Sequence, residues 1–184
     1  GSFNNYQSLT DEILGVWREI LRRTPNARLI MRAQEFESDA MIDAAYRRFK
    51  KLGLNMNAIL FKPATTDVMK DFQRIDIALS TYPRVDPAMT IDALYMGVPV
   101  ISIYTDRRDT RLAFDLLSSV GLGELAVENA QDYLVRAMGL AQSVDTLNTL
   151  HRNLRVMVSK AQAINPHNYV NLIEQHYQKC ITRI

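Results

Sequence analysis

Three arginines lie close together immediately after an apolar segment of the sequence. Arg107, Arg108 and Arg111 follow the segment from Val98 to Ile103, which is almost wholly apolar. A guanidinium group suits phosphate oxygens because its rigid set of N–H donors matches their geometry. We therefore consider Arg107 and Arg111 as candidate ligands of an anionic group. The alternative is that these arginines pair with nearby acids, which are Asp106, Asp109 and Asp115.

The motifs that usually mark catalytic or cofactor sites are missing from the sequence. It contains no GxGxxG dinucleotide motif, no GxxxxGK[ST] phosphate loop and no GxSxG nucleophile turn. It also lacks the HExxH and CxxC spacings of metal ligands, and its 3 histidines all lie late in the chain. A simple hydrolase or a metalloenzyme therefore has little support.

The elements that must position the arginines alternate between strands and helices. Short apolar segments predict strands at 27–31, 58–61, 75–79 and 98–103, with a further short strand near 125–127. Helical spacing of apolar residues predicts helices at 11–24, 38–51, 67–73, 88–96, 108–120, 130–141, 145–162 and 167–182. Apolar strands that alternate with helices indicate a parallel sheet buried on both faces. We expect an α/β fold, a Rossmann-like parallel sheet flanked by helices with a helical C-terminal extension.

An open parallel sheet binds its ligands at the carboxyl ends of its strands. Helices that begin there offer free backbone N–H groups and a positive dipole end, and both suit phosphate. The strand assignments therefore predict a ligand-binding edge formed by residues 1–9, 32–37, 62–67, 80–92 and 103–111. Arg32 and Lys62 lie at this edge and are additional candidates for a ligand contact.

The composition limits the broad class of the protein. The chain has 184 residues and a net charge of +2, which gives no argument for nucleic acid or a membrane surface as a partner. No apolar run approaches the roughly 20 residues of a membrane-spanning helix. The single cysteine, Cys180, cannot form a disulfide within the chain. We expect one domain over residues 1–184, with a helical tail from about 128, and a cytoplasmic location.

Several segments resemble the O-linked N-acetylglucosamine transferases and their bacterial tetratricopeptide-linked relatives. The most specific segment is Asp92 to Val100 (DALYMGVPV), preceded by Asp76 to Leu79 (DIAL). The opening GSFNN and the segment Trp17 to Pro25 (WREILRRTP) are similar to segments of that family, in the same order. Tetratricopeptide repeats themselves are absent from these residues. The resemblance extends through nearly the whole chain.

The resemblance implies a GT-B fold, in which two Rossmann-like lobes face each other across a cleft. In that family the C-terminal lobe holds a UDP-sugar, the N-terminal lobe helps to hold the acceptor, and no metal is required. This chain would then be the C-terminal, donor-binding lobe of a larger protein, and it would start at the end of the first strand of that lobe. Its expected partners are a nucleotide sugar, the N-terminal lobe of the parent chain and a protein acceptor.

The resemblance also implies roles for individual residues. Asp92 matches the acid that helps to hold the ribose, and Ala64 lies where the family's backbone contacts the uracil base. The backbone amides of Met89 and Thr90 stand at the helix start where the family has a phosphate-binding threonine pair. The alternatives without a ligand are that Asp92 is an acid of the first helical turn, which interacts favourably with the helix dipole, and that Thr90 only caps the helix.

Other positions depart from the family's pattern. Ser8 stands where the family has a lysine that neutralises the departing diphosphate, although Arg111 matches a family arginine. The Asn-Gly pair that the family has after its third strand is Val85-Asp86 here. Loss of a cation that stabilises developing charge costs several kcal/mol of transition-state stabilisation, on the order of 10² to 10³ in rate.

Two functions of different classes therefore stay open. The chain is the donor lobe of a nucleotide-sugar-dependent glycosyltransferase, or it is a degenerate lobe that serves as a binding or scaffolding module. Under either hypothesis we expect the isolated chain to be inactive in turnover. We also expect that aromatic residues of the last helix, Tyr169 and Tyr177, form an interface if they are exposed.

Overall fold

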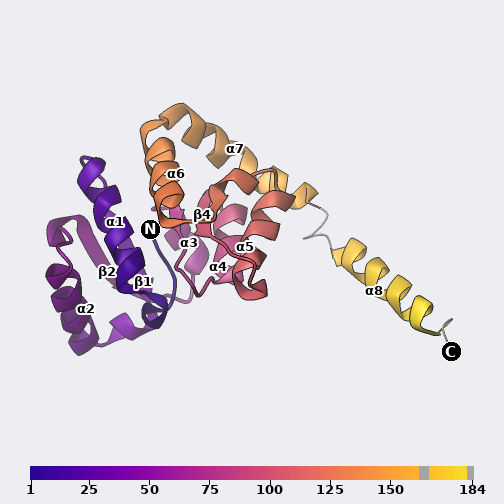
Figure 1. Cartoon of the computed structure of the whole chain (residues 1–184), viewed down its shortest axis with the longest axis horizontal. Helices are drawn as coiled ribbons and strands as arrows, with labels where there is room; N and C mark the ends of the chain where they lie inside the picture. The colour runs from indigo at the N-terminus through magenta and orange to yellow at the C-terminus, as the bar shows by residue number, and fades with distance from the viewer. Residues whose placement is uncertain (162–165, 182–184) are drawn as a thin grey trace.

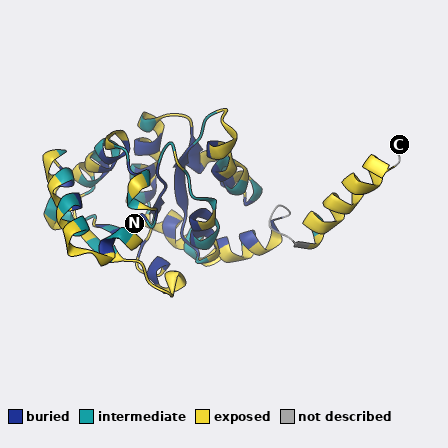
Figure 2. Cartoon of the chain, turned by 90° about the horizontal axis from the view of Figure 1, so that it is seen from below, coloured by how far each residue is buried: buried dark blue, intermediate teal, exposed yellow. Residues whose placement is uncertain are grey.

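The chain folds as an α/β structure in which parallel strands are covered by helices (Figure 1). A computed structural model describes residues 1–161 and 166–181. The predicted fold class is therefore confirmed. Figure 2 shows the strands buried at the centre of the body, with the exposed residues on the outer sides of the helices.

The strands form two hydrogen-bonded groups that run parallel. The first group pairs β1 (Leu29–Ala33) with β2 (Ile59–Pro63), and the second has the order β3 (Ala78–Leu79), β4 (Val100–Ile103) and β5 (Ala126–Val127). Register is fixed by pairs such as Met31 with Phe61 and Leu79 with Ile101. Parallel pairing places the carboxyl ends of all five strands at the same edge.

The first two residues of the chain join the two groups of strands. The amide of Ser2 donates to the carbonyl of Ile30 at 2.9 Å, and the amide of Arg32 donates back to the carbonyl of Ser2 at 3.0 Å. On the other side, the amide of Leu79 donates to the carbonyl of Gly1 at 2.8 Å. Residues 1 and 2 therefore act as a short central strand between β1 and β3, as the resemblance implied.

The described part of the chain contains eight helices and four short 3-10 turns, and all of the helices except α8 belong to the body that holds the sheet. The helices are α1 (Asp11–Arg23), α2 (Asp39–Lys51), α3 (Val68–Phe72), α4 (Pro87–Tyr95), α5 (Arg108–Ser119), α6 (Ala130–Gln142), α7 (Val144–Lys160) and α8 (Pro166–Ile181). The 3-10 turns are η1 (Tyr6–Ser8), η2 (Gln34–Glu37), η3 (Met56–Ala58) and η4 (Gly123–Leu125). The predicted helices are all present, with ends that differ by one to a few residues, and the ends predicted at 162 and 182 lie outside the described residues.

A buried hydrogen-bonded pair of aromatic residues connects the two sides of the core. Trp17 of α1 and Tyr133 of α6 are fully buried, and the indole Nε1 of Trp17 donates to the Tyr133 hydroxyl at 3.3 Å. That hydroxyl donates in turn to the backbone carbonyl of Ser80 at 3.0 Å. Each buried polar group of the chain Trp17–Tyr133–Ser80 thus has a partner, as burial requires. The contact fixes the residue that follows β3.

The strands start later than the sequence pattern predicts, and α4 shows why. Gly97 has a φ of 84°, a left-handed conformation that suits glycine, and its amide donates to the carbonyl of Leu94 at 3.0 Å. The amide of Val98 donates to the carbonyl of Ala93 at 2.8 Å. These bonds form a helix-terminating motif. Val98 therefore belongs to the end of α4, and β4 begins only at Val100.

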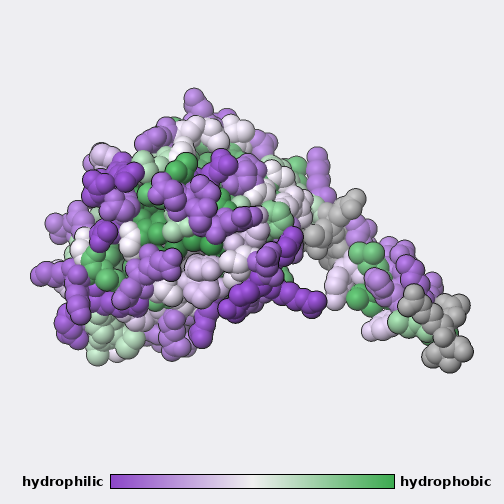
Figure 3. Space-filling view, viewed as in Figure 1, coloured by the Kyte–Doolittle hydropathy of each residue, from purple (hydrophilic) through white to green (hydrophobic). Residues whose placement is uncertain are grey.

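The last helix, α8, extends away from the body (Figure 1). Its exposed side chains include large apolar ones, with Tyr169 at 64% and Tyr177 at 66% exposure. Figure 3 shows hydrophobic and hydrophilic surface along the same helix. The interface predicted for these tyrosines stays a prediction. Among the residues that the structure describes, no helix is both long enough and apolar enough to cross a membrane.

Candidate functional site

The segments that follow the strands are tied together at the carboxyl edge of the sheet. Asn4, which is 1% exposed, donates from Nδ2 to the carbonyl of Leu79 at 3.3 Å. The hydroxyl of Thr10 donates to the carbonyl of Tyr82 at 3.2 Å. The segment after the central strand is therefore held against the segment after β3, at the edge where the parallel sheet is expected to bind its ligand.

The start of α4, where the phosphate-binding amides were predicted, carries a carboxylate. The side chain of Asp86 caps the helix, accepting from the amides of Ala88 at 3.0 Å and Met89 at 3.2 Å. An aspartate before a proline at the first helical position is a strong N-cap pattern. The Met89 amide is therefore already hydrogen-bonded to an anion that the chain itself provides.

Thr90 lies in the same turn but is fully buried. Its hydroxyl donates to the carbonyl of Asp86 at 3.0 Å, and its amide donates to the same carbonyl at 3.1 Å. The hydroxyl thus bonds back onto the preceding helical turn, so the Thr90 side chain is a structural part of the helix start. A phosphate contact from Thr90 or Met89 would require that Asp86 give up its bonds.

Asp92 lies in the second turn of α4 and is half-buried. Burial raises the pKa of the Asp92 carboxyl above its ordinary value, and the charge of Asp86 raises it further. The alternative reading of Asp92 as an acid of the first helical turn is wrong, because that turn of α4 contains no acidic residue. The dipole of α4 therefore does not account for Asp92.

The arginines that follow β4 are exposed and already interact with acids. Arg107 donates from Nε and Nη2 to the Asp109 carboxylate at 3.0 and 2.6 Å. Arg111 lies 4.0 Å from Asp106 and its guanidinium is 5.7 Å from the centre of the Phe114 ring. Exposed ion pairs of this kind contribute only about 0–1 kcal/mol. An anionic ligand can therefore compete for both arginines at small cost.

The segment after β2 contains Ala64, and its environment changes two predictions. Lys62 is a residue of β2 itself and does not follow the strand. Arg32 does not face the cleft as a free cation: its side chain is 8% exposed and forms an ion pair with Asp71 at 2.6 Å. Arg32 is therefore turned toward α3, which carries Asp71. The amide of Ala64 donates to the carbonyl of Ala33 at 3.1 Å, so only the carbonyl of Ala64 is left to contact the base of a nucleotide.

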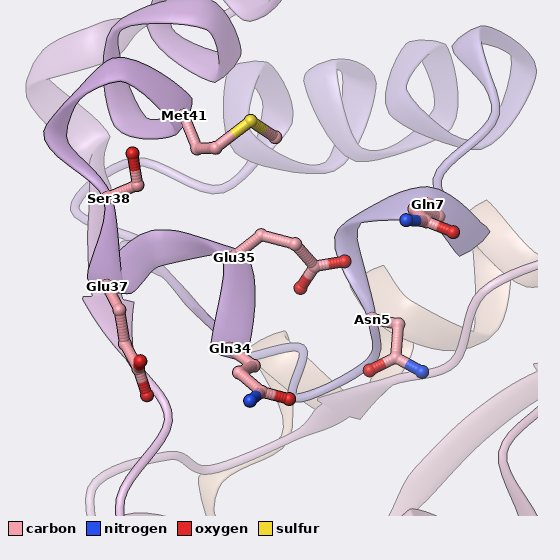
Figure 4. A pocket seen from close by; sticks show the side chains of 7 residues that line it. All are labelled: Asn5, Gln7, Gln34, Glu35, Glu37, Ser38 and Met41. Atoms are coloured by element: carbon pink, nitrogen blue, oxygen red, sulfur yellow. The ribbon is translucent and has the colours of Figure 1, made fainter.

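Ser8 is the last residue of η1 and is half-buried. A cavity of about 590 Å³ lies beside η1, lined by Asn5, Gln7, Gln34, Glu35, Glu37, Ser38 and Met41. Figure 4 shows the Glu35 carboxylate pointing toward the segment that carries Asn5 and Gln7. One oxygen of that carboxylate is buried and has no hydrogen-bond partner. The carboxylates of Glu35 and Glu37 only accept hydrogen bonds when ionised, so they suit a ligand that donates and disfavour phosphate.

A larger cavity, of about 710 Å³, lies at the opposite, amino edge of the sheet. Its lining is mainly apolar and includes Gly1, Trp17, Ile30, Ile77 and Leu147. The amino group of Gly1 donates to the carbonyl of Ile77 at 2.7 Å, and burial lowers its pKa to about 5. None of the predicted site residues lines this cavity, so its size alone does not make it the donor site.

Apart from Ser8 in η1, the residues of the predicted site fall into two groups. Asp92, Arg107, Arg111 and the Ala64 carbonyl are at the carboxyl edge in positions that leave them open to a ligand, whereas Met89 and Thr90 are engaged. Sequence reasoning missed the capping role of Asp86, which the Asp-Pro pair could have indicated. It also missed Asp71, because nothing local to Asp71 in the sequence points to its ion pair with Arg32.

Comparison with known proteins gives a consistent result over almost the whole chain. Residues 1–173 match the sequence profile of glycosyl transferase family 41. The chain is 32% identical over 181 residues to the probable UDP-N-acetylglucosamine–peptide N-acetylglucosaminyltransferase SPINDLY of Eustoma exaltatum subsp. russellianum, with 97% of this chain covered. It is 26% identical over 185 residues, with 96% of this chain covered, to the protein SEC of Arabidopsis thaliana, whose name gives the same probable activity.

Two solved structures share the fold of this chain. A mutant of the O-GlcNAc transferase of Thermobaculum terrenum superposes with a TM-score of 0.89 at 26% identity, covering 97% of this chain and 35% of that one. A glycosyltransferase of Rickettsia africae shares the fold with a TM-score of 0.67 at 12% identity, covering 98% of this chain and 47% of that one. The chain spans only 20% of the SPINDLY relative and 18% of SEC.

Proposed function

This chain belongs to glycosyl transferase family 41, and we propose that it is the lobe that binds the nucleoside diphosphate of a sugar donor, with UDP as the nucleotide. The lobe has the Rossmann-like fold that the resemblance to O-GlcNAc transferases implied, as half of a GT-B structure. The relatives' names specify transfer of N-acetylglucosamine from its UDP-linked form to peptide. We propose the same class of reaction for the protein of which this lobe is a part.

One observation supports the proposal most directly. The family-like segment Asp92 to Val100 folds as the end of α4 and the start of β4. The segments after the central strand and after β3 are bonded together through Asn4 and Thr10, at the carboxyl edge from which the chain enters α4. Two family-like parts of the sequence, GSFNN and DIAL, thus lead to the carboxyl edge, the edge at which parallel sheets bind ligands. From this edge α4 carries the third part, Asp92 to Val100, back to the start of β4.

We assign the ribose to Asp92 and the base to the backbone that begins at the Ala64 carbonyl. Arg107 and Arg111 would bind the diphosphate, because their present ion pairs are exposed and weak. The amides of Met89 and Thr90 would contribute only after Asp86 turns away. Ser8, at the position of the family's lysine, provides a hydroxyl but no positive charge. No metal is needed in this proposal.

The same features explain why we expect no turnover by the isolated chain. Departure of a nucleoside diphosphate needs a positively charged or strongly hydrogen-bonding group at the leaving oxygen. Neither Ser8 nor the capped start of α4 provides one, so in the proposed enzyme this charge would come from Arg107 and Arg111 or from the other lobe. The remaining lobe of the parent protein would supply the acceptor site and any base. A protein acceptor and a cytoplasmic location stay part of the proposal.

The second candidate function is a non-catalytic binding module. The capping of α4 by Asp86 and the absence of a cation at Ser8 are the observations that favour it. Family membership favours the transferase, since every relative named above is described as one. The two functions differ in whether the lobe retains affinity for a nucleotide sugar.

The deciding experiment is a calorimetric and thermal-shift titration of the chain with UDP, UDP-N-acetylglucosamine, GDP and ADP. A nucleotide present at 100 times its Kd should stabilise the fold by about 2.7 kcal/mol. The proposal predicts saturable binding of UDP and its sugar, and weaker binding of ADP. Absence of a response to every nucleotide would leave the binding-module function in its place.

A further inference from the structure

A buried ion pair underlies the segment that follows β2. Nη2 of Arg32, at the end of β1, lies 2.6 Å from Oδ1 of Asp71 in α3, and both side chains are 8% exposed. Removing two charges from water is costly, and an apolar pair of similar volume is often at least as stable. A buried pair of this kind is better explained by what it holds in place than by its contribution to stability.

The pair holds the residues on either side of Ala64. Nη1 of Arg32 donates to the carbonyl of Pro63 at 2.8 Å. The hydroxyl of Thr65 donates to Oδ2 of Asp71 at 2.6 Å, so the second oxygen of the same carboxylate is used. The amide of Ala64 completes the attachment through its bond to Ala33. The backbone of residues 63–65 is thus fixed at three successive positions.

The loop that is fixed in this way is exposed and offers free backbone groups. Ala64, Thr65 and Thr66 are all exposed. In the described part of the chain, the amides of Thr65 and Thr66 have no backbone or side-chain acceptor. Exposed loops are usually mobile, so an exposed loop attached to a buried ion pair indicates that its conformation matters. Free N–H and C=O groups held in one conformation can recognise a planar ligand edge that alternates donors and acceptors.

We infer that Arg32 and Asp71, through Thr65, are positioning residues that hold the backbone of residues 64–66 to read the hydrogen-bonding edge of the donor's base. The inference rests on the proposed function and adds how the base is selected. The edge of uracil presents an acceptor, a donor and an acceptor, whereas cytosine presents an acceptor at the central nitrogen. A fixed backbone carbonyl therefore accepts from uracil and is left unpaired by cytosine, which costs affinity.

The test compares the Kd values of UDP, CDP and inorganic pyrophosphate for the chain and its variants by calorimetry. Thr65→Val keeps the shape and branching of the side chain but removes its bond to Asp71. Asp71→Asn and Arg32→Lys weaken the pair itself. Thr149→Val is the matched control, because the exposed Thr149 hydroxyl makes a similar bond, to the carbonyl of Asp145 at 2.8 Å, far along the chain in α7.

We expect the unaltered chain to bind UDP more tightly than CDP. In Thr65→Val that preference should shrink by roughly fivefold to tenfold, the worth of about one hydrogen bond. The Kd of pyrophosphate, which has no base, should stay within about twofold, and Thr149→Val should change nothing. If Thr65 had a purely structural role, Thr65→Val would weaken the binding of all ligands alike or would only lower the melting temperature.

The outcomes separate this inference from the proposed function. If UDP binds and Thr65→Val leaves the ratio of CDP to UDP affinities unchanged, the base-reading role is wrong and the donor site stands. If UDP and CDP bind the unaltered chain equally, the role is wrong as well. If no nucleotide binds, both proposals fall. Should Asp71→Asn or Arg32→Lys fail to fold, the surface variant Thr65→Val still decides.

Discussion

The carboxylate of Asp86 accepts a hydrogen bond from the backbone amide of Met89 at 3.2 Å. The helix start that should attract a phosphate group therefore carries a negative charge of its own. This contact bears on how the lobe distinguishes a sugar donor from the diphosphate that is left after transfer. A nucleoside diphosphate carries about one more negative charge than its sugar ester, because it has a free terminal phosphate.

Asp86→Asn should tighten the binding of UDP more than that of UDP-N-acetylglucosamine. Asparagine is an equally good N-cap, so the helix start is kept while the repulsion is removed. At the surface one charge is worth about 1 kcal/mol, so we expect UDP affinity to rise roughly fivefold. The control is Asp145→Asn, which removes an acid from the first turn of α7. Equal tightening of both ligands would contradict this role of Asp86.

Asp92→Asn should stabilise the fold at neutral pH and weaken the binding of UDP. Since burial and Asp86 raise the pKa of Asp92, the folded state holds this proton more tightly than the unfolded state. The free energy of unfolding falls as the pH rises from the ordinary pKa of a carboxyl group, which holds in the unfolded chain, through the raised pKa of the folded state. The variant avoids that loss, so its melting temperature should exceed that of the unaltered chain at pH 7 but not at pH 3. A variant that is less stable at pH 7, or that binds UDP as before, would disprove both assignments.

The amino group of Gly1 should make the stability of this chain depend on pH between 8 and 5. Its pKa falls from 8.0 to about 5 because it is buried against the carbonyl of Ile77. The unfolded chain therefore binds more protons in this range, and the free energy of unfolding should fall as the pH falls. Three pKa units correspond to at most about 4 kcal/mol, and to less because Gly1 as a residue is only half-buried.

Denaturant unfolding at pH 8, 6.5 and 5 measures this dependence. Acetylation of the amino group removes the titration, and the cavity that Gly1 lines has room for the acetyl group. The acetylated chain should therefore lose less stability on acidification than the free chain. The same loss in both would show that other groups are responsible.

Tyr133→Phe should destabilise the fold by about 1–3 kcal/mol, because it leaves the buried Trp17 indole N–H and the Ser80 carbonyl without partners. The size of the ring is unchanged, so no cavity forms. Denaturant midpoints at constant m-value give the change. Tyr177→Phe on exposed α8 is the control and should change the free energy of unfolding by no more than about 0.5 kcal/mol. A neutral Tyr133→Phe would mean that the two polar groups find water instead.

Local patterns in the sequence predicted the order of helices and strands well. Thr10 caps α1, with its hydroxyl accepting from the amide of Ile13 at 3.3 Å, and Gly53 and Gly97 end their helices at positive φ. The strands were predicted too early where helix-ending turns use the first amides, as at Val98. Residues 1 and 2 are too few to show a strand periodicity, so only the resemblance predicted their place in the sheet.

The site was harder to predict because its key contacts are either overlooked or distant in sequence. The Asp86-Pro87 pair is an N-cap pattern, but the resemblance assigned the start of this helix to phosphate binding. The ion pair between Arg32 and Asp71 joins β1 to α3, and neither residue's neighbours predict it. Asp92 was placed on the correct helix, but one turn later than a dipole-favouring acid would be.

Titration of the backbone amide NMR spectrum with UDP tests the central claim most directly, since it reports both binding and location. The proposed function predicts saturable shifts that cluster at the carboxyl edge, in residues 3–8, 64–67, 86–92 and 104–111. The residues that line the cavity at the amino edge, such as Ile20 and Leu147, should stay unchanged. No saturable shift, or shifts confined to the amino-edge cavity or to α8, would contradict the assignment of this lobe as the donor-binding site.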